Sequence, residues 1–250
     1  MARVKYFRPG SLKEAIELLT MQDTIPLAGG TYLTSLKPFA KNLVDLQDLG
    51  LDKIKARTNF IEIGSMVKLQ QLYNSQILPE PFQIALKLEA PLNIRNSISL
   101  GGQITRCTGR SSLATALLAM DAKITLKPGS ETLSLLEFLL IKRNGLKNQI
   151  ITSILIEPKI QFSFHFISRT SYDLPIVCVA VGEFQSSKLR IALGGYGENP
   201  ILAYEGRFSD NLELFAGNAF TNAEDAWASA SYRSAMAEIL TKRCLDQLVP

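Results

Sequence analysis

Histidine and cysteine are scarce in this sequence of 250 residues, and their scarcity limits the metal chemistry of the chain. His165 is the single histidine, which excludes sites built from several histidines and disfavours a histidine-based catalytic triad. The cysteines are few and widely spaced: Cys107, Cys178 and Cys244. An iron–sulfur cluster generally takes four cysteines at characteristic spacings, and a disulfide framework takes an even number. We therefore expect neither, and no metal site, on this chain.

Long apolar runs and basic clusters are also missing. No stretch approaches the roughly 20 apolar residues that cross a bilayer, and Met1 to Tyr6 lead into a polar turn instead of a signal-peptide core. We expect a cytoplasmic protein without a membrane span. The formal net charge is +4, and no Lys/Arg run is interleaved with aromatic residues, which disfavours nucleic-acid binding. A hydrophobic content of 46% with 20% charged residues is typical of a globular protein.

The sequence contains two glycine pairs but lacks the usual phosphate-binding fingerprints. The pair in Leu27–Thr31 lacks the G-x-G-x-x-G spacing of a Rossmann turn, and no G-x-x-x-x-G-K-[ST] loop occurs. The second pair lies in Ser99–Gln103, and each pair follows a stretch that reads as a strand. Glycine lets backbone amides come close to an anion, so two such loops could hold the two phosphates of a dinucleotide. The alternative is that each pair serves an ordinary tight turn.

Longer motifs surround both pairs. Ala28–Leu33 matches an A-G-G-T/Q-x-L turn, and Ile94–Gln103 resembles the more specific pattern I-R-N-x-x-[ST]-[IL]-G-G-N. The chain thereby resembles the FAD-binding subunits of the molybdenum hydroxylases, such as the flavin domain of xanthine dehydrogenase and the medium chain of aerobic carbon monoxide dehydrogenase. Further matches to that family extend almost to the C-terminus, in Leu117–Ala122, Arg190–Gly195 and Ala228–Arg233 with Met236.

The resemblance implies one FAD, whose pyrophosphate contacts both glycine loops, with Thr31 and Ser99 adding hydroxyl donors. Three positions depart from the family pattern: Tyr32 replaces Asp or a small polar residue, Gln103 replaces Asn, and Ser112 replaces Asp. No catalytic side chain is predicted, because a flavin subunit relays electrons and needs no acid–base pair. The predicted cofactor-binding residues are Leu27, Ala28, Gly29, Gly30, Thr31, Tyr32, Leu33, Ser99, Leu100, Gly101, Gly102, Gln103 and Ser112.

The same resemblance implies partners and a function. The chain would be the electron-transfer subunit of a molybdenum hydroxylase, next to a molybdenum-containing large subunit and a small subunit with two-iron two-sulfur clusters. Electrons would pass from those clusters to FAD and then to NAD, a quinone or oxygen. Two alternatives stay open. The three departures could mark a flavin-free or weakly binding scaffold subunit, and a stand-alone FAD oxidoreductase would need its own substrate pocket and base.

Several other side chains could have a functional role, but the sequence indicates these roles less specifically. Arg95 and Asn96 could orient the second loop through hydrogen bonds. Arg106 and Arg110 could pair with a diphosphate, although exposed arginines are mostly solvated or in surface ion pairs. We interpret His165 as structural, and Cys107 as a buried, inert thiol.

The predicted fold is α+β, with a two-lobed FAD-binding domain of the PCMH type and a C-terminal antiparallel sheet with helices, as in the carbon monoxide dehydrogenase flavoprotein. The FAD-binding domain is placed at 1–157, with lobes of about 1–52 and 53–157, and the C-terminal domain at 158–250. The elements that matter below are a helix capped by Ser11, a helix capped by Ser65, a helix capped by Ser111 or Ser112, a hairpin of Ile176–Phe184 and Lys188–Leu193, and a helix over 223–248.

Overall fold

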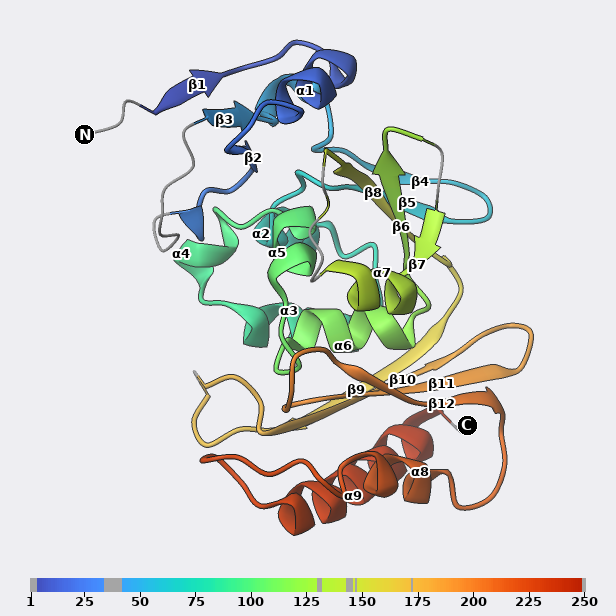
Figure 1. Cartoon of the computed structure of the whole chain (residues 1–250). Helices are drawn as coiled ribbons and strands as arrows, with labels where there is room; N and C mark the ends of the chain where they lie inside the picture. The colour runs from blue at the N-terminus through green and yellow to red at the C-terminus, as the bar shows by residue number, and fades with distance from the viewer. Residues whose placement is uncertain are drawn as a thin grey trace. The chain divides into compact units, whose positions relative to one another are not determined.

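The computed structural model describes residues 4–33, 42–129, 132–142, 146, 148–171 and 173–248 (Figure 1). The chain forms two compact units. Unit 1 consists of Met1–Asn74, Leu92–Arg106 and Lys123–Ile156, and unit 2 of Ser75–Pro91, Cys107–Ala122 and Glu157–Pro250. Each unit is therefore assembled from segments that are separated in the sequence. The predicted domains and lobes, with boundaries at about residue 52 and near Pro158, stay predictions.

A small parallel sheet and one helix open unit 1. The sheet has the order β1-β3-β2 and is formed by β1 (Lys5–Phe7), β2 (Thr24–Leu27) and β3 (Asn42–Asp45). The hydroxyl of Ser11 accepts the Glu14 amide at 3.2 Å and so caps α1 (Leu12–Leu19), as predicted. Apolar residues of α1 and β3 are buried together. Because β2 ends at Leu27, the first glycine pair follows a strand, as predicted.

A larger antiparallel sheet forms the rest of unit 1. Its order is β4-β5-β8-β6-β7, with β4 (Ile54–Ala56), β5 (Ile61–Gly64), β6 (Lys123–Lys127), β7 (Thr132–Ser134) and β8 (Ile150–Ile156). Its helical segments are η2 (Gln47–Leu49), α2 (Leu69–Ser75), α4 (Leu92–Arg95), α5 (Leu100–Arg106) and α7 (Leu135–Ile141). The prediction that Ser65 caps a helix is wrong. Helix α2 begins at Leu69, and the Ser65 amide instead donates to the Thr152 carbonyl at 3.0 Å.

Unit 2 is a four-stranded antiparallel sheet with helices on both faces. The order is β12-β11-β10-β9, with β9 (Gln161–Ile167), β10 (Val177–Glu183), β11 (Lys188–Gly194) and β12 (Ile201–Arg207). Helices α3 (Glu80–Glu89) and α6 (Ser112–Ala119) lie on one face, and α8 (Leu212–Ala219) and α9 (Ala230–Leu248) on the other (Figure 1). Strands β10 and β11 pair from Cys178–Gly194 to Glu183–Leu189, which confirms the predicted hairpin.

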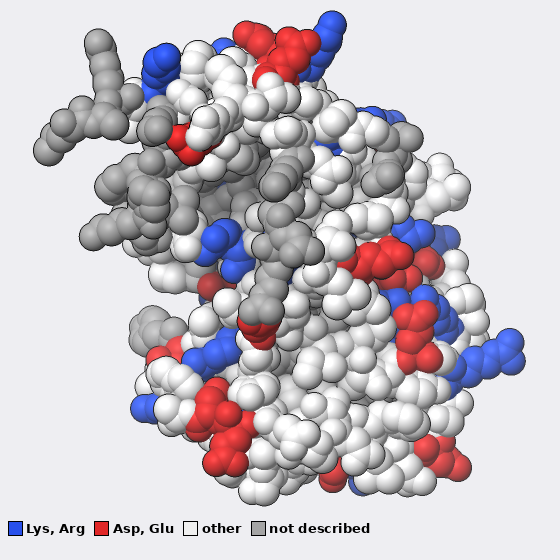
Figure 2. Space-filling model, viewed as in Figure 1, with Lys and Arg blue, Asp and Glu red and all other residues white. Residues whose placement is uncertain are grey.

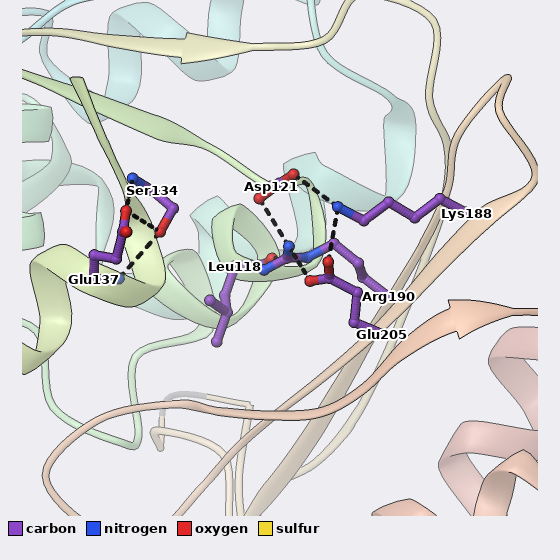
Figure 3. A network of polar contacts seen from close by, with 7 residues as sticks. All are labelled: Leu118, Asp121, Ser134, Glu137, Lys188, Arg190 and Glu205. Carbon is purple, nitrogen blue, oxygen red and sulfur yellow. Dashed lines mark hydrogen bonds and ion pairs between the residues drawn. The ribbon is translucent and has the colours of Figure 1, made fainter.

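A group of charged side chains around the buried Arg190 fastens the end of α6 to the sheet of unit 2. The Arg190 guanidinium donates to the Leu118 carbonyl at the end of α6 at 3.1 Å and to the Asp121 carboxylate at 2.8 Å, and it also pairs with Glu205 (Figure 3). Lys188 bridges the same two carboxylates at 3.1 and 3.0 Å. Every charge in this group has an opposite partner, so the group has a structural role.

The last helix is shorter than predicted. Helix α9 begins at Ala230, not at residue 223, and the Ser229 hydroxyl accepts the Tyr232 amide in its first turn. Before the helix, the chain wraps around the fully buried Arg233, whose guanidinium donates to the carbonyls of Ala223 and Ala228 at 2.7 and 2.9 Å. A helical backbone would have used those carbonyls for its own hydrogen bonds, so the non-helical stretch is what satisfies the arginine.

Candidate cofactor-binding site

The first glycine pair forms a turn in which each glycine meets a different requirement. Gly30 has a φ of +70°, a conformation that disfavours residues with a Cβ. At Gly29, an added Cβ would overlap the carbonyl oxygen of Ser97. Within the described part of the chain, the amides of Gly29, Gly30 and Thr31 donate to no protein acceptor. Successive free amides of this kind can bind an anion.

The second glycine pair is not a loop, which corrects the prediction. It lies in the first turn of α5, after α4 and a short turn instead of a strand. Its backbone donors are already engaged: the Gly101 amide donates to the Ser65 carbonyl at 2.8 Å, and the Gly102 amide to the Ser99 hydroxyl at 3.2 Å. The amides of Leu100 and Gln103 donate to other carbonyls. The pair therefore offers an anion no spare backbone donor.

Close packing explains why glycine is present at both positions of α5. A Cβ at Gly101 would lie 2.8 Å from the Cβ of Ser65, and one at Gly102 would lie 2.9 Å from the Ser99 hydroxyl. Ser99 is buried, and its hydroxyl oxygen accepts the Gly102 amide, so the hydroxyl that was predicted to contact the cofactor caps the helix. The Ser65 hydroxyl beside Gly101 is buried and has no hydrogen-bond partner among the described residues.

Two contacts bring the two glycine segments together within unit 1. The first is the approach of Gly29 to the Ser97 carbonyl. In the second, the guanidinium of Arg106, at the end of α5, lies 3.1 Å from the centre of the Tyr32 ring. Both side chains are exposed, and Arg106 has no ion-pair partner among the described residues. Stacking on an aromatic face orients a guanidinium while leaving its N–H groups free.

Lys68 lies at the same junction, and the sequence analysis did not identify it. Its ammonium donates to the Ser97 carbonyl at 3.0 Å and is half-buried, with no carboxylate in ion-pair contact among the described residues. Burial lowers the pKa of Lys68, and the negative charge of Asp45 opposes that shift. The Asp45 carboxylate itself accepts hydrogen bonds from the Tyr6 hydroxyl and the Gln47 amide.

Ser112, the remaining predicted site residue, belongs to unit 2 and is fully buried. Its hydroxyl donates to the Ala85 carbonyl at 2.8 Å and to the Glu89 carboxylate at 3.0 Å. The same carboxylate accepts the Ser111 hydroxyl and the Leu113 amide, both at 2.8 Å, while Ser111 is the cap residue of α6. A protein carboxylate therefore already occupies the start of α6, where helix geometry favours an anion.

Arg110 and Arg95, which were considered from the sequence, have hydrogen-bond partners inside the protein, whereas the buried Nε2 of His165 has none among the described residues. Arg110 donates to the carbonyls of Pro175 and Leu174 in unit 2 at 3.2 and 2.8 Å. In unit 1, Arg95 donates to Gln70 at 2.9 Å, which fastens the turn before α5 to α2. His165 lies in β9 opposite Val179. None of these contacts points to a ligand.

A family model for the FAD binding domain in molybdopterin dehydrogenase matches residues 2–158, which is more than half of the chain. The chain belongs to this family. Its cofactor is FAD, and it is an oxidoreductase subunit. The membership confirms the resemblance that the two glycine motifs indicated.

Relatives and solved structures extend the match over the whole chain. An uncharacterised protein of Escherichia coli strain K12, YgfM, is 29% identical, with 94% of this chain and 93% of that protein covered. The glyceraldehyde dehydrogenase medium chain of Sulfolobus acidocaldarius is 27% identical over 80% of this chain and 78% of its own length. A chain of the reconstituted CO dehydrogenase from Oligotropha carboxidovorans has a TM-score of 0.82 at 21% identity, covering 98% of this chain and 97% of that one. The predicted fold class is thereby confirmed.

Two further features of the described residues concern membrane-spanning helices and surface charge. None of the helices in the described ranges has the length and apolar character needed to cross a membrane. On the face drawn in Figure 2, Lys and Arg side chains lie among Asp and Glu side chains, and the described residues form no continuous basic field there.

Proposed function

We propose that this chain is the FAD-carrying electron-transfer subunit of a molybdenum-containing dehydrogenase complex. Its partners would be a molybdenum-containing large subunit and a small subunit with two-iron two-sulfur clusters, and NAD, a quinone or oxygen would accept the electrons. The proposal is supported by the family match together with the similarity to a dehydrogenase medium chain over 80% of this chain. When bound, FAD supplies the redox chemistry, since it can exchange one or two electrons.

We further propose that the segments Leu27–Leu33 and Ser99–Gln103 of unit 1 hold the FAD diphosphate. The fit is supported by the turn at Gly29 and Gly30, which presents unengaged amides, and by its packing against the segment before α5. In this arrangement the first pair binds and Gly29 permits the close approach to the Ser97 carbonyl that places the turn, whereas the second pair lets α5 pack against Ser65. The chain's own contribution is to bind and orient the cofactor.

Purification of the tagged chain from its native cells tests the proposed function. We expect about one FAD per chain, together with companion polypeptides that carry molybdenum and iron–sulfur clusters. The recombinant chain alone should bind FAD but should oxidise neither xanthine nor an aldehyde. Hydroxylase activity without partners, or a native preparation that contains flavin but neither metal, would contradict the proposal.

A scaffold subunit that binds its FAD weakly is the second candidate, and specific observations favour it. The Ser112 hydroxyl is committed to Glu89 and Ala85, and the amides of the second pair are committed to protein acceptors. A complex that contains well under one FAD per copy of this chain, and a purified chain that loses its FAD readily, would support the scaffold.

A further inference from the structure

The site in unit 1 has fewer backbone donors than its two glycine pairs suggest. The amides of residues 100–103 all donate within the protein, so the second glycine pair adds no N–H groups to those that the turn at Gly29 and Gly30 offers an anion. A diphosphate carries its charge on several oxygens. Amides of one turn leave much of that charge unpaired, and the remaining donors must come from side chains.

Lys68 is one side chain in the right place. Its ammonium contacts the Ser97 carbonyl, and the same carbonyl oxygen lies against Gly29. The ammonium is half-buried and has only that neutral oxygen as its hydrogen-bond acceptor among the described residues. Partial burial of an ammonium without an anionic partner is unfavourable, so a bound anion at this position would be stabilised.

Arg106 is the second side chain. Its guanidinium stacks on Tyr32, which belongs to the first turn, and no acceptor among the described residues occupies its N–H groups. A stacked guanidinium is held in one orientation, so it loses less conformational freedom when it binds a phosphate. Tyr32, which departs from the family pattern, thus has a physical role: it holds a cation beside the turn.

We propose that Lys68 and Arg106 are cofactor-binding residues that pair with the diphosphate of FAD, in place of the amides of the second glycine pair. This inference rests on the proposed function, because it assumes that FAD binds at the turn in unit 1. The inference also predicts which flavins the site prefers. Because Lys68 and Arg106 would pair with phosphate groups, the site should bind FAD more tightly than riboflavin, which has the same ring and no phosphate.

Affinity measurements on the purified full-length chain, stripped of flavin, test the inference. Lys68→Met and Arg106→Gln should each weaken FAD binding by about tenfold or more, since a charge-assisted hydrogen bond is lost. Riboflavin affinity should change little in either variant. Lys68→Arg and Arg106→Lys should recover part of the lost affinity. Matched controls are Lys53→Met and Arg57→Gln, exposed cations of the same unit, which should bind FAD like the wild type.

The outcomes separate the two proposals. If the wild type binds FAD and both charge-removing variants bind it equally well, the role of Lys68 and Arg106 is overturned and the proposed function stands. If the wild type binds no FAD, both are overturned. A salt titration of the wild type needs no variant: added NaCl should weaken FAD binding but not riboflavin binding, because salt screens charge pairs. An FAD affinity that does not change with salt would overturn the inference.

Discussion

Gly29→Ala tests the contact that places the first turn. The added Cβ would overlap the Ser97 carbonyl oxygen, and this neighbour is backbone, which cannot rotate away as a side chain can. Inserting a methyl group into such a contact typically destabilises a protein by about 1–3 kcal/mol. Alanine also restricts the unfolded chain, which favours folding by about 0.4–1 kcal/mol. We therefore expect a net loss of up to about 2 kcal/mol, with weaker FAD binding because the turn is displaced.

Gly10→Ala is the matched control. A Cβ at Gly10 has no heavy atom within 4 Å, so this variant keeps the unfolded-state effect and lacks the overlap. The difference in unfolding free energy between the two variants, measured by urea denaturation of the flavin-free chain, isolates the steric penalty. We expect that difference to be about 1–3 kcal/mol. Equal stabilities would refute the reasoning, and so would a Gly29→Ala chain with unchanged stability and FAD affinity.

Three further predictions concern buried groups of unit 2. Glu89→Ala leaves the Ser111 hydroxyl and the Leu113 amide at the start of α6 without their acceptor, while the Ser112 hydroxyl keeps the Ala85 carbonyl. Urea denaturation should therefore show a loss of about 2–6 kcal/mol, at about 1–3 kcal/mol for each unsatisfied donor; a loss below about 1 kcal/mol would contradict this role. Burial raises the pKa of the Cys178 and Cys244 thiols to about 12, so iodoacetamide should label neither in the folded chain and both in urea. The pKa of the Asp225 carboxyl is also shifted. Burial raises this pKa, but the hydrogen bonds from Arg233 and two backbone amides lower it by more, so that the net shift is downward from the ordinary value of 3.8. The ionised Asp225 carboxylate therefore stabilises the folded chain fully above pH 3.8, and this stabilisation is lost as the pH falls through the folded pKa. In urea denaturation below pH 3.8, the stability of the Asp225→Asn variant should fall less steeply with pH than that of the wild type.

Sequence patterns predicted an element correctly where the contacts that form it join residues close to each other in the sequence. The Ser11 cap and its helix can be predicted because the serine hydroxyl and the Glu14 amide are three residues apart. The β10–β11 hairpin can be predicted because a short polar turn at residues 185–187 joins two mostly apolar stretches of strand length. The turn after β2 follows in the same way, since Gly30 supplies the positive φ that the turn needs.

Contacts between residues far apart in the sequence determine the features that sequence patterns did not predict correctly. The second pair reads as a phosphate loop, but its glycines are required by packing against Ser65 and by the Ser99 cap in a helix. Ser112 reads as a cofactor contact because its partner Glu89 lies 23 residues earlier in the sequence. Lys68 carries no local signal, because its significance comes from the Ser97 carbonyl, 29 residues away. A pattern search cannot detect such pairs without the fold.

The distribution of paired and unpaired charge separates the structural from the ligand-binding parts of this molecule. In unit 2, the buried charges have protein partners: Arg190 has two carboxylates, Arg233 has Asp225, and Glu89 has three donors. Such groups stabilise the fold and are not available to a ligand. In unit 1, Lys68 and Arg106 flank a turn with unengaged amides, and within the described ranges neither has an ionic partner. The FAD diphosphate that we propose at this site would complete the arrangement, and unit 1 contains both glycine motifs of the family.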